Sequence, residues 1–129
     1  MKITSAIGQL RTTDLASSIR FFTVTVGLEL DFRHEDFYAG IRAGEQVFHL
    51  KLVDEKDPSL ETVGEGGHFH LYFQTDDVDG LRERLKGNGV DPVQDVHDTA
   101  WGTRELVIKD DQGHTLYFGE TLPTADNDR

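Results

Sequence analysis

The 129 residues are enough for one domain, and the absence of cysteine excludes disulfides, thiolate nucleophiles and cysteine-based zinc sites, as suits a reducing cytoplasm. The formal net charge of −11 argues against nucleic acid as a partner, because phosphate groups repel an acidic surface, and it favours a cationic ligand. We expect neither a signal peptide nor a membrane partner, because no apolar run approaches the length that either requires.

The first half of the chain predicts a strand, a helix and three more strands. The helix begins after Asp14, which ends a capping cluster, and stops at Gly27. Its apolar stripe consists of Leu15, Ile19, Phe22 and Val26. The predicted strands cover residues 3–11, 28–34, 37–43 and 46–53.

The second half predicts the same order of elements. Its helix follows Asp77, carries Val78, Leu81 and Leu85 on one face, and ends at 87–89. The predicted strands cover residues 67–75, 92–97, 103–109 and 115–120. The sequence therefore predicts a single α+β domain of two βαβββ modules whose curved mixed sheets surround a cavity. Module one covers 1–53, the linker 54–67, module two 68–120 and a loose tail 121–129.

Each predicted strand has one apolar face and one face that mixes aromatic and hydrogen-bonding residues. Successive side chains of a strand point to opposite sides, so the apolar face packs under the helices. A solvated face would hold more Lys, Glu and Ser, whereas ligand pockets combine apolar bodies with a few polar groups. The predicted ligand-binding residues are Gln9, Arg11, His49, His70, Tyr72, Glu105 and Tyr117, with Trp101 near the rim.

The histidines leave two interpretations open. His68 and His70 lie on the same face of one strand, and with His49 they could form the three-histidine site that catalytic zinc accepts. Two histidines with Glu105 could instead form a facial triad for iron. The alternative is a pocket without metal, because a pocket for a polar ligand also uses histidine.

Three sequence segments resemble a known family. They are the opening segment 9–22, the Trp-Gly-Thr-Arg-Glu segment 101–105, and the Asp-x-x-Gly segment 110–113. Together with the repeated βαβββ order, they resemble the vicinal oxygen chelate superfamily. That superfamily includes glyoxalase I, bleomycin-resistance proteins, fosfomycin-resistance enzymes and extradiol dioxygenases. The resemblance covers about residues 3–120 and is closest to the bleomycin-resistance branch.

The resemblance also identifies the positions at which metal-dependent members hold their ion. These positions correspond to Ile7, His49, His70 and Tyr117, of which Ile7 has no donor atom and Tyr117 is a poor ligand. The resemblance therefore favours metal-free sequestration of an aromatic or cationic compound, as in antibiotic resistance. The alternative is a metal-dependent lyase, isomerase or dioxygenase that uses zinc, iron, manganese or nickel.

A homodimer is expected on two grounds. The resemblance implies one, and each module has a sheet of about four strands with open edges that a second chain can cover.

Overall fold

The structure is a computed structural model that describes residues 1–65 and 70–123. The chain divides into two compact units, Met1–Leu60 and Glu61–Arg129, and each unit is described by itself. The boundary lies inside segment 54–67, the predicted linker. In the described part of the chain, no helix is both long and apolar enough to cross a membrane.

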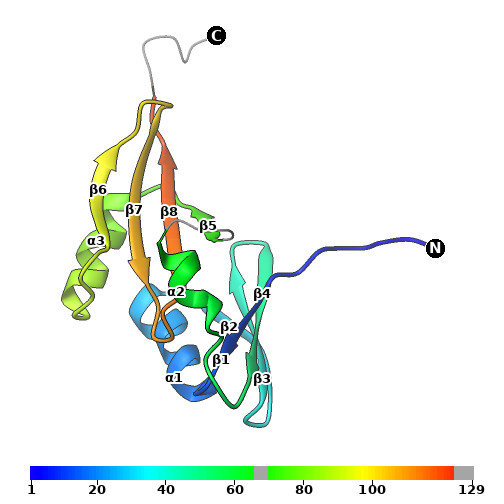
Figure 1. The fold of residues 1–129 in the computed structure, drawn as a ribbon. Coiled ribbons are helices and arrows are strands. Elements are labelled where there is room, and N and C mark those ends of the chain that lie inside the picture. Colours follow the sequence, from blue (N-terminus) through cyan, green and yellow to red (C-terminus); the bar gives the residue numbers. More distant parts are fainter. Residues whose placement is uncertain (66–69, 124–129) are drawn as a thin grey trace. The chain divides into compact units, whose positions relative to one another are not determined.

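The first unit contains a four-stranded mixed sheet with helices on one face (Figure 1). Its elements are β1 (Gln9–Thr12), α1 (Leu15–Arg20), η1 (Phe21–Val26), β2 (Glu29–His34), β3 (Tyr38–Ala43) and β4 (Gln46–Leu52). The strand order is β1-β4-β3-β2, with β1 parallel to β4 and the other pairs antiparallel. A first and a last strand that pair in parallel across a helix give the predicted βαβββ order.

The predicted first helix is present, but its second half is π-helical. The Asp14 carboxylate accepts a hydrogen bond from the Ser17 amide at 3.0 Å and caps the start of α1. In η1, the Thr23 hydroxyl donates to the Ile19 carbonyl at 2.7 Å, a type of back-bond that disturbs regular helical turns. Gly27 ends the helix with φ of 101°, a left-handed conformation that glycine adopts without steric cost.

The first strand is shorter than predicted, since β1 begins at Gln9 rather than at residue 3. The preceding segment contains Ser5, Ala6 and Gly8, which favour strands weakly and have little side-chain surface to bury. Ile7 lies in this segment and is 48% exposed.

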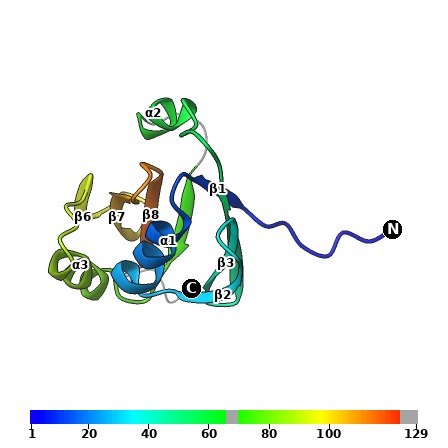
Figure 2. The same ribbon diagram turned by 90° about the horizontal axis from the view of Figure 1, so that it is seen from below.

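The second unit repeats the architecture of the first (Figure 2). Its elements are β5 (Leu71–Gln74), α3 (Val78–Gly87), β6 (Gln94–Asp98), β7 (Thr103–Lys109) and β8 (Thr115–Thr121). The strand order is β5-β8-β7-β6, with β5 parallel to β8. The two mixed sheets with their helices confirm the predicted α+β fold.

A short helix that the sequence analysis did not predict, α2 (Ser59–Gly64), lies inside segment 54–67. The Asp57 carboxylate accepts a hydrogen bond from the Ser59 amide at 2.9 Å, which satisfies a free donor at the start of this helix. Pro58 stands between them, at a position where a missing amide hydrogen costs the helix nothing.

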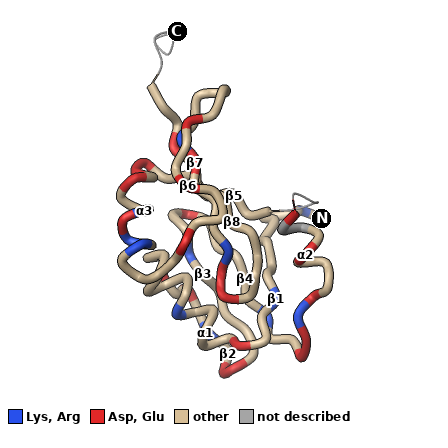
Figure 3. The backbone as a smooth tube through the Cα atoms, turned by 60° about the vertical axis from the view of Figure 1, so that its left-hand side comes forward, with Lys and Arg blue, Asp and Glu red and all other residues tan. Residues whose placement is uncertain are grey.

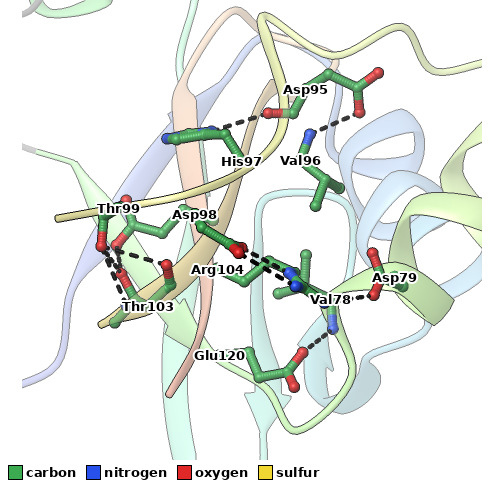
Figure 4. A network of polar contacts seen from close by, with 11 residues as sticks. Val78, Asp79, Asp95, Val96, His97, Asp98, Thr99, Thr103, Arg104 and Glu120 are labelled. Carbon is green, nitrogen blue, oxygen red and sulfur yellow. Dashed lines mark hydrogen bonds and ion pairs between the residues drawn. The ribbon is translucent and has the colours of Figure 1, made fainter. Parts of the chain in front are cut away.

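Ion pairs attach α3 to its sheet (Figure 4). Arg104 on β7 donates to Asp98 on β6 at 2.7 Å and to Asp79 on α3 at 3.0 Å. The hydrogen bond to Asp98 raises the pKa of Arg104, and the same bond lowers the pKa of Asp98. The Glu120 carboxylate accepts a hydrogen bond from the Val78 amide at 2.9 Å, so β8 also holds the start of α3.

The Asp-x-x-Gly segment 110–113 forms the turn between β7 and β8. The Asp110 carboxylate accepts hydrogen bonds from the amides of Gln112 and His114, at 2.9 and 2.8 Å. It also contacts the His114 ring at Nδ1, 2.7 Å away. This part of the family resemblance therefore reflects turn geometry, with an aspartate side chain that satisfies the amides of a tight loop.

Acidic residues occur along both units and are not confined to one element (Figure 3). In the described sheets, β1 and β2 are the outer strands of the first and β5 and β6 those of the second. The homodimer expected from these edges stays a prediction, which sedimentation of the purified chain tests.

Candidate functional site

Each sheet has one face toward its helix and one face that carries the predicted ligand-binding residues. Phe22 of η1 contacts Phe48 of β4, and Arg104 of β7 contacts Asp79 of α3, which identifies the helix side of each sheet. By alternation, the neighbouring residues point to the other side. We call these the first polar face, comprising Gln9, Arg11, Tyr38, His49 and Lys51, and the second polar face, comprising His70, Tyr72, Thr103, Glu105, Thr115 and Tyr117.

On the first polar face, three side chains form a hydrogen-bonded row across three strands. The Gln9 amide donates to the Tyr38 hydroxyl at 3.1 Å, and this hydroxyl lies 2.8 Å from His49 Nδ1. The Phe32 ring stands perpendicular to the His49 ring, with 5.1 Å between their centroids. The structure thus joins the predicted residues Gln9 and His49 through Tyr38.

Arg11, the third predicted residue of this unit, lies apart from that row. It is exposed and is the register partner of Lys51, so β1 and β4 place two cationic side chains next to each other. This Arg11–Lys51 pair is the part of the first polar face that could bind an anionic group such as a carboxylate.

On the second polar face, Glu105 accepts two hydrogen bonds. The Tyr72 hydroxyl donates to Glu105 Oε2 at 2.8 Å, and the Thr103 hydroxyl donates to the same oxygen at 3.0 Å. Glu105 is only 6% exposed, so its carboxylate is buried against two neutral hydroxyl groups.

The hydrogen-bonded groups on the two faces are equivalent by the internal repeat. Gln9 and Tyr72 stand at the same distance before the aspartate that caps the following helix. Their register partners in the parallel neighbouring strands are His49 and Tyr117. In each unit a side chain from the first strand therefore reaches across the last strand to a partner on the third.

The environment of Tyr72 changes its acidity. The pKa of the Tyr72 phenol is raised from 10.0 to about 12, because burial, the hydrogen bond to Glu105 and the negative charge of that carboxylate all raise it. The hydrogen bond with Thr103 lowers it in part. The side chain as a whole is 46% exposed, so the effect concerns its hydroxyl end, which lies at Glu105.

We expect one of the three tyrosines to ionise at about pH 12 in an ultraviolet titration of tyrosinate. Because folding raises this pKa, the stabilisation is present below pH 10.0 and is lost as the pH rises through about 12. Glu105→Gln removes the negative charge beside the phenol and should lower the pKa of Tyr72. Circular dichroism at each pH confirms that the chain stays folded, and three tyrosines ionising together near pH 10 in the folded protein would contradict the assignment.

Aromatic rings extend the second polar face from Glu105 toward His70. The rings of Tyr72 and Tyr117 are stacked at 6.4 Å, and those of Tyr117 and His70 lie 5.1 Å apart. His70 Nδ1 and the hydroxyl of Thr115 are buried and have no hydrogen-bond partner among the described residues. His68, which is part of the predicted metal set, lies outside the described residues.

Trp101 lies in the turn between β6 and β7 and is 74% exposed. Hydrogen bonds between Thr99 and Thr103 close this turn, with 2.8 Å between their hydroxyl oxygens. Thr103 also binds Glu105, so the Trp101 turn is connected to the second polar face through one threonine.

The comparisons with known proteins agree on one family. The family model described as the Glyoxalase/Bleomycin resistance protein/Dioxygenase superfamily matches residues 4–118, which is most of the chain. The chain belongs to this superfamily. No curated protein matches the sequence.

Solved structures of the superfamily share the fold at low sequence identity. TioX from Micromonospora sp. ML1 is 22% identical, with a TM-score of 0.73, over 94% of this chain and 98% of that one. A lactoylglutathione lyase from Agrobacterium tumefaciens is 23% identical, with a TM-score of 0.69, over 92% and 95%. A bleomycin-binding protein from Streptomyces verticillus, complexed with copper(II)-bleomycin, is 21% identical, with a TM-score of 0.66, over 96% and 99%.

The residues of this superfamily member do not fit the metal site that the resemblance implies. Ile7 offers only hydrocarbon and lies before β1, and Tyr117 offers a phenol where a carboxylate is needed. His49 Nδ1 lies within hydrogen-bond distance of Tyr38, so only its Nε2 is left as a donor atom for a metal. Within residues 1–65 and 70–123, no three His, Asp or Glu side chains are grouped as a metal site requires.

The sequence analysis did not include Tyr38, Thr103 and Thr115 among the site residues. The period-two alternation was the available signal, because it puts Thr103 on the face of Glu105 and Thr115 on the face of Tyr117. Tyr38 could have been found in the same way, since its neighbour Ala39 is fully buried on the helix side.

Proposed function

We propose that this chain binds a small aromatic or cationic compound on its polar sheet faces and that it does so without a metal. The observation that supports this most directly is the second polar face, where a buried carboxylate, two stacked tyrosines and a histidine lie together. Such a combination of flat apolar surfaces with a few placed hydrogen-bonding groups is typical of small-molecule sites.

Family membership supports the same proposal. One structural neighbour is a bleomycin-binding protein that was solved in complex with copper(II)-bleomycin, so a protein of this fold is known with a bound small-molecule ligand. The net charge of −11 favours capture of cations, because it attracts them before they reach the site.

Trp101 is the only tryptophan and serves as the reporter for a binding test. We expect bleomycin and small aromatic amines to change its fluorescence saturably, and we expect the affinity to fall as salt screens the acidic surface. Small aromatic acids should bind more weakly. Acids that bind more tightly than amines, with a preference that Arg11→Ala removes, would contradict the cationic assignment and point to the Arg11–Lys51 pair.

The metal question has a separate measurement. Protein purified without a chelator should contain zinc, iron, manganese and nickel well below one ion per chain. A content of one metal ion per chain, lost in the His70→Ala variant, would contradict the metal-free proposal. It would favour a metal-dependent enzyme.

A further inference from the structure

The hydrogen-bond partners of Glu105 in the described part of its unit are neutral hydroxyl groups. Among the described residues, its buried carboxylate accepts hydrogen bonds from Tyr72 and Thr103, and both bonds end on Oε2. In the described part of the second unit, no Lys or Arg forms an ion pair with it. Burying a carboxylate without a countercharge costs free energy, so a cation that binds next to Glu105 would stabilise this arrangement.

The basic side chains closest to Glu105 in sequence and register contact other groups or lie far away. Arg104 points to the helix side, where Asp98 and Asp79 bind it. His97 is the cross-strand partner of Glu105, but its Nδ1 bonds the Asp95 carbonyl at 2.9 Å. Lys109 lies four residues along β7, about 13 Å away at the usual strand rise.

The hydroxyl groups around Glu105 remain protonated at neutral pH. The ordinary phenol pKa of 10.0 already keeps the Tyr72 hydroxyl protonated at neutral pH, and its surroundings raise that pKa further, to about 12, so it stays a neutral donor and adds no second negative charge. A ligand cation would therefore meet the single negative charge of Glu105. The hydrogen bonds from Tyr72 and Thr103 orient the Glu105 carboxylate.

An independent observation at the other end of the same face points to a ligand. Thr115 is 6% exposed, and its hydroxyl has no partner among the described residues. His70 Nδ1, from the adjacent strand position, is buried and unpartnered in the same way. Buried polar atoms are nearly always hydrogen-bonded in folded proteins, so these two atoms require a partner beyond the described residues, and we assign that partner to the ligand.

We propose that Glu105 is the specificity-determining residue for an amine or guanidinium group whose aromatic body lies against Tyr117. This inference rests on the proposed function and narrows its ligand class from an aromatic or cationic compound to one that carries both features. Glu105 is paired with Gly119, and Thr115 lies four residues along β8, so a molecule that reaches both ends of this face must span about 13 Å at the usual strand rise.

The test compares three probes with a phenyl ring on a four-carbon chain whose end group is cationic, neutral or anionic: 4-phenylbutylamine, 4-phenylbutanol and 4-phenylbutanoate. Amide and side-chain chemical shifts of the second unit, including those of Gly119 and Tyr117, report where each probe binds. We expect the amine to bind about tenfold more tightly than the alcohol, because hydrogen bonds to a charged group are stronger than those between neutral groups. The acid should bind least.

Glu105→Gln keeps the shape and should abolish the preference for the amine. Glu83→Gln on α3 removes the same charge from the exposed helix and is the matched control, which should keep the preference. Equal binding of amine and alcohol to wild-type protein, with shifts on the second polar face, would overturn the role of Glu105 and leave the proposed function intact. No shifts on that face with any probe at millimolar concentration would overturn both.

Discussion

Replacing Phe22 with alanine is expected to lower the free energy of unfolding by about 3–5 kcal/mol. Phe22 is fully buried, and its ring meets those of Phe48 and Phe21 edge to face, with centroids 5.0 and 5.4 Å away. Alanine loses both ring contacts and leaves a cavity between η1 and β4. Because whole domains are stable by only about 5–15 kcal/mol, this single change removes a large part of the total.

The measurement is urea unfolding followed by circular dichroism. If the two units unfold separately, only the transition of Met1–Leu60 should move. Val24→Ala in the same helix is the matched control, because Val24 is 56% exposed and its loss should change the stability by about 0.5 kcal/mol or less. Equal effects of the two changes would show that Phe22 does not occupy the core position described here.

Replacing Gly119 with alanine is expected to displace Tyr72 from Glu105. A Cβ atom at this position would lie 1.8 Å from the Tyr72 hydroxyl oxygen and 2.5 Å from Cζ, so the ring must move. Glu105 then loses one of its two donors while it stays in a buried position. We expect a stability loss of about 1–3 kcal/mol, the usual cost of leaving a buried polar group unsatisfied.

Two readouts separate this displacement from general destabilisation. The pKa of Tyr72 should fall from about 12 toward 10.0, because the phenol leaves the carboxylate. In a Tyr72→Ala background, Gly119→Ala should cost little, since the clash no longer exists.

The matched control for Gly119→Ala is the same substitution at Gly87. Gly87 is the last residue of α3, and a Cβ there would meet no atom within 4 Å. This change should be neutral or stabilise the chain by up to about 1 kcal/mol, as alanine favours helices over glycine. A Gly119→Ala variant that keeps the wild-type stability and a Tyr72 pKa of about 12 would contradict the claim that the Tyr72 side chain crosses β8 at Gly119.

Local sequence patterns were sufficient to predict the two long helices and the eight strands of the described residues and the faces of those strands, but not the short helix α2. Asp14 and Asp77 cap helices as predicted, and Leu10 is buried while its neighbours Gln9 and Arg11 are exposed. These features depend on residues within one turn or two strand positions of each other, so a single sequence contains them. The repeated order of elements then predicted the fold, and the family model and the solved structures confirmed it.

The limits of some elements depended on interactions that periodicity does not describe. The π-helical turn contains a hydrogen bond from the Thr23 hydroxyl to the Ile19 carbonyl, and at the start of α2 the Asp57 carboxylate accepts one from the Ser59 amide. Both are hydrogen bonds between a side chain and the nearby backbone. Such bonds compete with regular backbone hydrogen bonding and leave the apolar pattern of the sequence unchanged.

The partners within the candidate site could be decided only by the tertiary structure. Alternation places Tyr72 and Glu105 on the polar faces of their strands, but 33 positions separate them in the sequence. Their hydrogen bond forms because β5 and β7 both pair with β8 and so lie on either side of it. Gly119 permits that contact only because it stands where the Tyr72 side chain crosses the sheet. Strand register joins distant segments and is set by long-range pairing, so no local pattern in the sequence contains it.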